Sequence, residues 1–198
     1  IVEIKGSEVI SSWEKVEKGI WKVKIPNTFF GDYNPYVDSI NGDWFNNWGR
    51  IHHTGDVFLN GESLFEKEEL DLVLSSTDTR NNEKLGSGYT WYCESDGEST
   101  IIWANFHGFN PNKELAEINV RKTCIYPSKP GINYITISGF EISQAATQWA
   151  APTAEQIGMI ATHWNKGWII ENNKIHNSRC SGITLGKEKS TGHNVWLA

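Results

Sequence analysis

The chain has 198 residues, of which 38% are hydrophobic and 21% charged, with a formal net charge of −6. This length suits one domain or two small ones. A negative charge without a cluster of lysine and arginine disfavours nucleic acid and anionic membranes as partners, since both bind basic surfaces. No apolar run approaches the ~18 residues of a membrane span. The three widely spaced cysteines (Cys93, Cys124 and Cys180) form no disulfide or zinc pattern, so we expect buried free thiols. No metal or cofactor is expected.

A short motif appears first at residues 4–9, IKGSEV, and recurs at 137–142, ISGFEI, and 33 residues later at 170–175, IENNKI. Each copy predicts two short strands joined at a corner where Gly or Asn tolerates a left-handed backbone. Asn172 or Asn173 would occupy the last corner, with its amide bonded to the neighbouring coil. Such repeats favour a parallel β-helix, and the alternative is an ordinary β-hairpin protein with chance similarity.

The region from Trp13 to Cys124 has a different pattern. Runs such as GIWKVKIP, TIIWANF and EINVRKTC alternate apolar and polar residues between Gly, Asn or Asp, which is typical of an antiparallel sandwich. Asn60 and Gly61 predict a type I′ hairpin turn, and EKEELDLVL is the one helix candidate.

We therefore predict an all-β chain in three parts. Residues 1–9 form a first β-helix strand pair, 10–131 an inserted sandwich, and 132–198 further coils truncated at the C-terminal end. Two or three coils need caps that this sequence does not show, so we expect a segment of a longer polypeptide.

Ten tryptophans are the strongest functional signal. Four fall on alternating strands and are predicted to be core residues: Trp13, Trp21, Trp91 and Trp103. Four others lie in loops rich in Gly, Asn, Pro and Thr: Trp44, Trp48, Trp149 and Trp164. An aromatic face in such a loop can stack on a sugar ring, and the alternative is that the rings clamp the loops onto the scaffold.

Other candidates for chemistry are weaker. His52 and His53 are consecutive, so at most one can face a given site on a strand. His163 precedes a coil strand, where a structural hydrogen bond is the alternative to a substrate contact. No spacing singles out an acid/base pair among the available carboxylates, which include Asp43, Asp56, Glu141, Glu155 and Glu171. Phosphate-loop, serine-elbow and zinc-protease motifs are absent from the sequence.

Several stretches together resemble the β-xylosidases of glycoside hydrolase family 120: VEIKGSEVISSWEKV, NTFFGDYNPY, GDVFLNG, AEINVRKTCIYP, YITISGFEISQAATQWAAPTAEQ and NKGWIIENNKIHNSRCSGITLGKE. The resemblance implies a right-handed parallel β-helix with an inserted, jelly-roll-like sandwich. It also implies a retaining mechanism with an aspartate nucleophile and a glutamate acid/base. The family motifs that carry this pair do not occur here, so no catalytic residue is expected in this segment, and the pair is expected beyond residue 198.

The resemblance also implies a role for Trp44 in Gly42-Asp43-Trp44, which matches an aromatic that reaches from the inserted domain over the substrate pocket. Our candidate substrate-binding residues are Trp44, Asp43, Trp149 and His163. The expected ligand is a xylo-oligosaccharide or related sugar, and the expected partner is the rest of the polypeptide.

The predicted function is a segment of a retaining glycoside hydrolase that releases xylose, contributing the substrate-covering domain and early coils. The alternatives are a β-helix polysaccharide lyase, with a calcium ion and a basic residue, and a non-catalytic carbohydrate-binding β-helix protein. Homo-oligomer formation stays open, and the cytoplasm is favoured over secretion.

Overall fold

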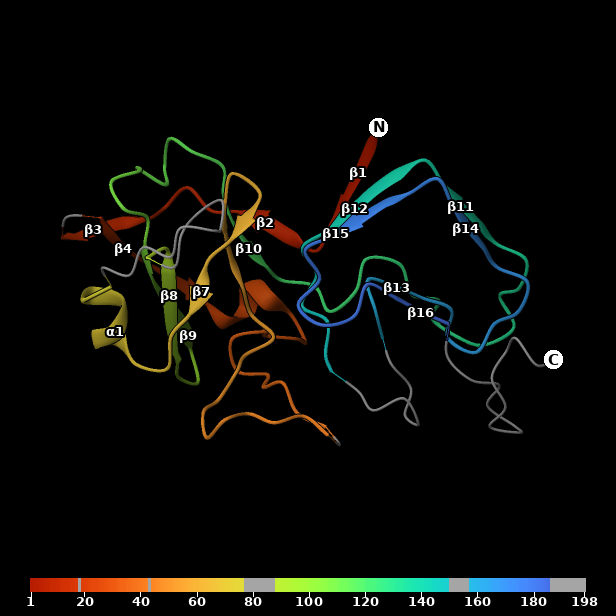
Figure 1. The fold of residues 1–198 in the computed structure, drawn as a ribbon, viewed down its shortest axis with the longest axis horizontal. Coiled ribbons are helices and arrows are strands. Elements are labelled where there is room, and N and C mark those ends of the chain that lie inside the picture. The colour runs from red at the N-terminus through yellow and green to blue at the C-terminus, as the bar shows by residue number, and fades with distance from the viewer. Residues whose placement is uncertain (18, 43, 77–87, 150–156, 186–198) are drawn as a thin grey trace. The chain divides into compact units, whose positions relative to one another are not determined.

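The computed structural model describes residues 1–17, 19–42, 44–76, 88–149 and 157–185, which form many short strands and little helix (Figure 1). The chain divides into two compact units. We call Ile1–Ser7, Ile40–Asn46 and Arg121–Ala198 the parallel unit, and Glu8–Ser39 and Asn47–Val120 the antiparallel unit. The predicted all-β class is confirmed. Within the described ranges, no helix is long and apolar enough to cross a membrane.

The parallel unit is built from short strands that pair in parallel. They are β1 (Val2–Lys5), β11 (Thr136–Ser138), β12 (Phe140–Ser143), β13 (Ile160–Ala161), β14 (Ile169–Glu171), β15 (Lys174–His176) and β16 (Ile183–Thr184). Their order is β1-β12-β15, β11-β14 and β13-β16, and Figure 1 shows β12 beside β15 and β11 beside β14. Ile137 lies opposite Ile170, and Ile142 opposite Ile175. The 33-residue repeat predicted from the sequence therefore equals the spacing between paired residues in these strands.

The corners between these strands have the predicted backbone. Gly139 and Asn172 both adopt left-handed conformations, with φ of 82° and 54°. The amide of Asn173 bridges to the preceding repeat, donating from Nδ2 to the Ile137 carbonyl at 2.8 Å and accepting the Phe140 N–H at 3.0 Å. The expected corner amide is thus confirmed at Asn173.

Residues 4–9 also lie on two short strands that meet at Gly6, as predicted, but they do not align with the other two copies of the motif. Ile4 lies opposite Ile142 rather than Ile137, and the next strand, β2 (Ser7–Val9), joins a sheet of the antiparallel unit. Gly6 explains the misleading pattern. Its backbone is not left-handed, but a Cβ there would lie 2.5 Å from the Ala145 Cα. Glycine is needed here for the close approach of two backbone segments and not for a left-handed backbone.

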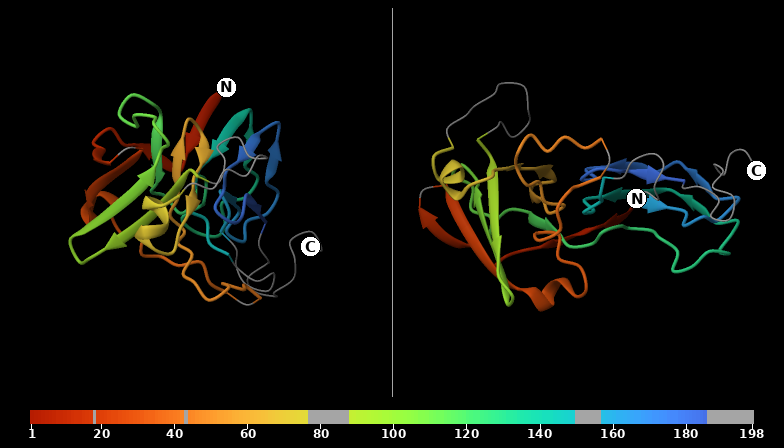
Figure 2. Two further views of the ribbon diagram at one scale, coloured as in Figure 1. Left: turned by 60° about the vertical axis from the view of Figure 1, so that its left-hand side comes forward. Right: turned by 90° about the horizontal axis from the view of Figure 1, so that it is seen from below.

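The antiparallel unit contains two sheets around one core. One sheet has the order β2-β10-β5-β6, with β5 (Val57–Leu59), β6 (Glu62–Ser63) and β10 (Ala116–Asn119). The other has the order β3-β4-β9-β8-β7, with β3 (Glu14–Glu17), β4 (Ile20–Pro26), β7 (Phe65–Glu66), β8 (Thr90–Ser95) and β9 (Ser99–Asn105). Neighbours pair antiparallel except β7 with β8. Figure 2 shows the long β8–β9 hairpin in yellow-green.

Local predictions hold in this unit. Asn60 and Gly61 both have positive φ, 53° and 85°, and connect the antiparallel strands β5 and β6 as a type I′ turn requires. The helix candidate contains α1 (Leu70–Leu74), whereas the 3-10 helix η1 (Asn27–Phe30) was not predicted.

The tryptophan predictions hold in part. Trp13 and Trp91 are buried as expected, whereas Trp21 is only partly buried at the edge of the core. Trp103 was wrongly predicted as a core residue. Its neighbours on β9, Ile102 and Ala104, face the core, so by strand alternation Trp103 points to the other face, where its ring lies 6.0 Å from that of Tyr92.

Candidate functional site

The segment that carries Trp44 is attached to the parallel unit. The Asn41 N–H donates to Gln148 Oε1 at 3.2 Å, and Gln148 Oε1 also accepts the Trp149 N–H at 3.0 Å. One side-chain amide oxygen therefore joins the two segments. Gly42 follows, and a Cβ at this position would lie 2.8 Å from Trp149 Cδ1. Only glycine allows the 40–46 segment to approach the Trp149 ring so closely.

Trp44 as a whole residue is 79% exposed, and its backbone is left-handed with φ of 67°. This conformation is uncommon for a bulky residue. The Phe45 N–H donates to the Gly42 carbonyl at 3.1 Å and closes a tight turn around residue 44. An indole displayed on a strained turn whose base is anchored offers a flat apolar surface to a ligand. Asp43, also a predicted binding residue, lies outside the described residues.

Trp149 is half-buried and follows a run of buried residues, 142–147. Its position against Gly42 fits the role of a clamp on the 40–46 segment, which is the alternative that the sequence left open for the loop tryptophans. A clamp and a sugar contact are compatible, because part of the ring stays exposed. Gln148, which holds both backbones, was not predicted, since a single glutamine carries no sequence signal for such a contact.

His163 has a fixed ring. Its Nδ1 lies 2.6 Å from the Pro127 carbonyl oxygen, and the ring stacks on Tyr126 with centroids 4.5 Å apart. A carbonyl can only accept, so Nδ1 carries the proton and Nε2 is the acceptor of the neutral ring. This geometry supplies the structural hydrogen bond that the sequence offered as an alternative. An acceptor at Nε2 could also receive a hydrogen bond from a sugar hydroxyl.

Two of the available carboxylates have defined partners. Asp56 Oδ2 accepts from Ser63 Oγ at 2.6 Å and Oδ1 from the Val57 N–H at 2.9 Å, so it stabilises the β5–β6 hairpin. Glu141 Oε1 accepts from Lys174 Nζ and, at 2.8 Å, from His176 Nε2. These hydrogen bonds, the one from Lys174 first, lower the pKa of Glu141. An ionised carboxylate held in this way is poorly suited to act as a general acid at neutral pH.

The described residues of the parallel unit offer little reactive chemistry. Burial raises the pKa of the Cys124 thiol to about 11, so it stays protonated and is a poor nucleophile. Over the described ranges, no three His, Cys, Asp or Glu side chains are arranged to hold a metal ion. The features that remain are aromatic surfaces and hydrogen-bonding groups, which are suited to binding.

Two comparisons with known proteins give a match. Residues 10–118 match the family model "Glycoside hydrolase 120, insertion domain". A solved structure described as "The complex structure of XylC with xylose" matches with a TM-score of 0.91 and 46% sequence identity, over 98% of this chain and 32% of that chain. The chain thus spans about a third of the length of that protein. None of the curated proteins compared with the chain matches it.

Proposed function

Because the chain belongs to glycoside hydrolase family 120, we propose that it is part of a retaining β-xylosidase that releases xylose from xylo-oligosaccharides. The xylose in the complex of the matching protein supports a pentose as the substrate unit. The short coverage of that protein supports an enzyme in which this chain supplies the substrate-covering domain and the early coils.

We propose the following architecture for the whole protein. The parallel strand pairs are coils of a right-handed β-helix, and residues 10–131 are a jelly-roll-like sandwich inserted between residues 1–9 and 132–198. The same 33-residue offset in the β11–β14 and β12–β15 pairs supports the coils, because stacking of repeats of equal length produces it, whereas Ile160 on β13 pairs with Ile183 on β16 at a shorter offset. The family model over residues 10–118 supports an insertion that begins at residue 10 and extends at least to residue 118.

The anchored turn at Trp44 carries the proposal for the site. Its base is bonded to Gln148 and packed on Trp149, while Trp44 as a whole residue is 79% exposed. In the proposed complex the Trp44 ring stacks on the C–H face of a terminal sugar. Trp149 supports the turn and adds apolar surface, and Asp43 and His163 Nε2 provide partners for sugar hydroxyls.

The chemical step itself is assigned to the rest of the polypeptide. Retention requires two carboxylates about 5 to 5.5 Å apart, one to attack the anomeric carbon and one to protonate the leaving oxygen. Glu141, bonded to Lys174 and His176, is poorly suited to that acid role. The proposed aspartate nucleophile and glutamate acid/base therefore lie outside this chain, whose residues bind and orient the substrate.

The test is Trp44→Ala in the full-length enzyme. Loss of the stacking surface should lower kcat/KM on an aryl xyloside by about 10- to 100-fold, or about 1.4 to 2.7 kcal/mol. Because the ring is exposed, the melting temperature should change little. Trp44→Phe is the matched control, since it keeps an aromatic face and should retain most of the activity.

Two outcomes would contradict this proposal. Full activity in Trp44→Ala, or a loss explained by unfolding, would make the ring a structural clamp. An unsaturated product whose formation stops with a chelator would instead indicate a polysaccharide lyase.

A further inference from the structure

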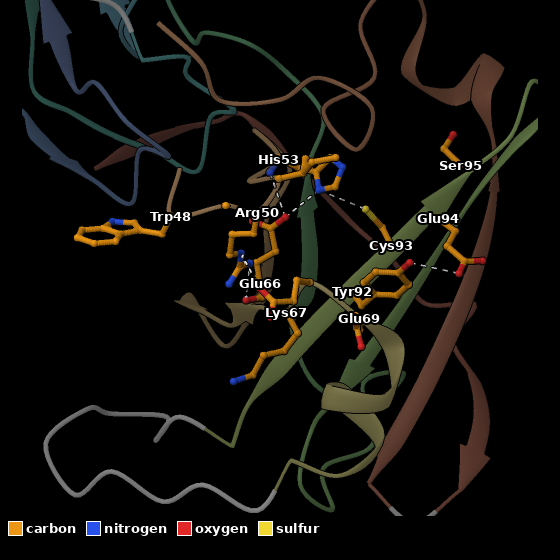
Figure 3. Close-up of a pocket in the computed structure, with 13 residues that line it drawn as sticks. Trp48, Arg50, His53, Glu66, Lys67, Glu69, Tyr92, Cys93, Glu94 and Ser95 are labelled. Atoms are coloured by element: carbon orange, nitrogen blue, oxygen red, sulfur yellow. Dashed lines mark hydrogen bonds and ion pairs between the residues drawn. The ribbon is translucent and has the colours of Figure 1, made fainter. Parts of the chain in front are cut away.

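The antiparallel unit contains a pocket of its own, with a volume of about 690 Å³ (Figure 3). One wall is formed by the segment from Trp48 to His53, and the opposite wall by β8, including Tyr92 and Glu94. Glu66 and its neighbours line the space between them. Pockets that bind small molecules commonly enclose about 300 to 1,000 Å³, so this one has room for more than one sugar ring.

Trp48 lies at one end of the pocket, as Figure 3 shows. Its side chain is 82% exposed, and its backbone is left-handed with φ of 54°. A bulky residue in this conformation costs about 1 to 3 kcal/mol, and strain of this kind gathers at ligand sites. Exposing so large an apolar ring adds little to folding. Both features are explained if the indole is displayed for a ligand.

The segment that holds Trp48 is fixed to the body of the unit. Asn47 caps the turn, accepting the Gly49 N–H on Oδ1 at 3.0 Å and the Arg50 N–H on its carbonyl at 3.2 Å. Glu66 Oε1 then accepts both the backbone N–H and Nδ1 of His53, at 3.0 and 2.7 Å. Since the Glu66 side chain is only 5% exposed, this pair is protected from water. The wall is therefore preorganised, which lowers the entropic penalty of binding.

The charges of the pocket select the class of ligand. Its lining includes four glutamates, at positions 66, 68, 69 and 94, against the two cations Arg50 and Lys67. The guanidinium of Arg50 already donates to the Glu66 carbonyl at 3.0 Å and lies 3.7 Å from Glu68. A phosphate or uronic acid would therefore meet net negative charge, which disfavours it.

A neutral, hydroxyl-rich ligand fits these groups better. The Tyr92 hydroxyl donates to Glu94 Oε1 at 3.3 Å, a long bond that a sugar hydroxyl could replace or bridge. Burial, with the nearby Glu94 charge, raises the pKa of Tyr92, so this hydroxyl remains a donor. An exposed indole at one end and carboxylate and hydroxyl groups at the other match the alternating C–H faces and hydroxyls of a sugar chain.

We propose that this pocket binds a neutral oligosaccharide, with one sugar stacked on Trp48 and hydroxyls of another bonded to Tyr92 and Glu94. The identification of the sugar units as xylose rests on the proposed function. The proposal that the pocket binds a neutral oligosaccharide does not.

The experiment is isothermal titration of the full-length protein with a sulfur-linked xylohexaose, which glycosidases do not cleave. The same titration is done with cellohexaose and with oligogalacturonate, so that a failure of the xylosidase proposal does not hide the pocket. We expect Trp48→Ala to weaken one class of binding site at least about 10-fold, and Tyr92→Phe to weaken it by about 3- to 10-fold. If a catalytic pocket also binds the ligand, Trp48→Ala lowers the stoichiometry from two to one. If it does not, the stoichiometry falls from one to zero.

The control is Tyr134→Ala, which removes an aromatic side chain of the same 82% exposure, also on a left-handed residue, from the other unit. It should leave the isotherm unchanged. Isotherms of Trp48→Ala identical to the wild type for both neutral hexaoses would overturn the proposal. Equal losses in Trp48→Ala and Tyr134→Ala would do so too, as would a Trp48-dependent site that takes only the oligogalacturonate.

Discussion

The two units hold their strands together by different means. The core of the antiparallel unit is rich in buried aromatic rings, including Trp13, Tyr36, Trp91 and Phe106. The corresponding cluster of the parallel unit is built on smaller aliphatic side chains, such as Ile137, Ile142 and Met159. Burial of apolar surface scales with side-chain size, so the antiparallel unit gains more from each residue that it buries.

The parallel unit compensates with side-chain hydrogen bonds between successive repeats. Asn173 bonds to backbone groups 33 and 36 residues earlier, and Asn165 Oδ1 accepts the Ile132 N–H 33 residues earlier. Thr147 Oγ1 accepts the N–H groups of Cys180 and Ser181. Short strands leave backbone groups without ladder partners at each corner, and these side chains satisfy them. Truncation of an apolar side chain should therefore destabilise the antiparallel unit most, and truncation of an amide side chain the parallel unit.

The largest effect is expected for Trp91→Ala. Trp91 is fully buried on β8, so its loss should lower the free energy of unfolding by about 3 to 5 kcal/mol. Chemical denaturation of the wild type and variant measures this. Trp103→Ala on the adjacent strand is the control, since this ring is only half-buried and faces away from the core. Equal losses at both positions would refute the account of the aromatic core.

Asn173→Ala tests the amide bridges. It leaves the Ile137 carbonyl and the Phe140 N–H without their side-chain partner, and should lower the free energy of unfolding by about 1 to 3 kcal/mol. The neighbouring variant Asn172→Gly keeps the bridge and suits the left-handed backbone, so its stability should stay within about 0.5 kcal/mol of the wild type. A loss below that limit in Asn173→Ala would indicate a solvated corner.

Gly61→Ala and Gly139→Ala test a property that the two units share. Both glycines are left-handed, with φ of 85° and 82°, and a Cβ at either would meet no atom within 4 Å. Only backbone strain should act, so each should lose about 1 kcal/mol. The control is Gly97→Ala, which has the same open space without the positive φ and should be near neutral. Different losses in the two units would show that their turns are supported unequally.

The smallest effect concerns Glu141 and acid. Hydrogen bonds from Lys174 and His176 lower its pKa in the folded state below the ordinary value of 4.5. A lowered folded pKa means that this stabilisation is present above about pH 4.5 and is lost as the pH falls through the folded value. Glu141→Gln should therefore lose less melting temperature than the wild type when both are taken from pH 6 to pH 3. Parallel melting curves over that range would contradict the assignment.

The features that could be predicted from the sequence were those determined by residues close together in the chain. The Asn60–Gly61 turn and the 33-residue register follow from a few neighbouring residues, so the pattern was sufficient. The side of β9 on which Trp103 lies depends on which strands cover the sheet, and tryptophan is common on either side. Gly6 made residues 4–9 look like another copy of the motif, because a glycine in a sequence can indicate either a left-handed backbone or a close approach of two segments. The sequence alone does not distinguish the two.

The sites were harder to predict for the same reason. The tryptophans of the loops could be recognised as candidates from their surroundings. The contacts that hold them could not, because Gln148 lies more than a hundred residues from Asn41. The pocket beside Trp48 likewise combines three separated segments, and nothing in any one of them indicates the other two.

The pairing of β1 with β12 has a consequence for the order in which the molecule folds. Ile4 on β1 lies opposite Ile142 on β12, and just beyond these strands Ser7 Oγ bonds to Gln144, 137 residues later, so β1 emerges from the ribosome long before its parallel neighbour. The antiparallel unit is complete by Val120, and its folding joins Ile10 to Ala116 at 2.9 Å. The effective loop that β1 must close then shrinks to about 30 residues, which lowers the free-energy cost of loop closure by roughly 1 kcal/mol. We expect the antiparallel unit to fold first during synthesis. Its folding would shorten the loop that β1 must close to pair with β12.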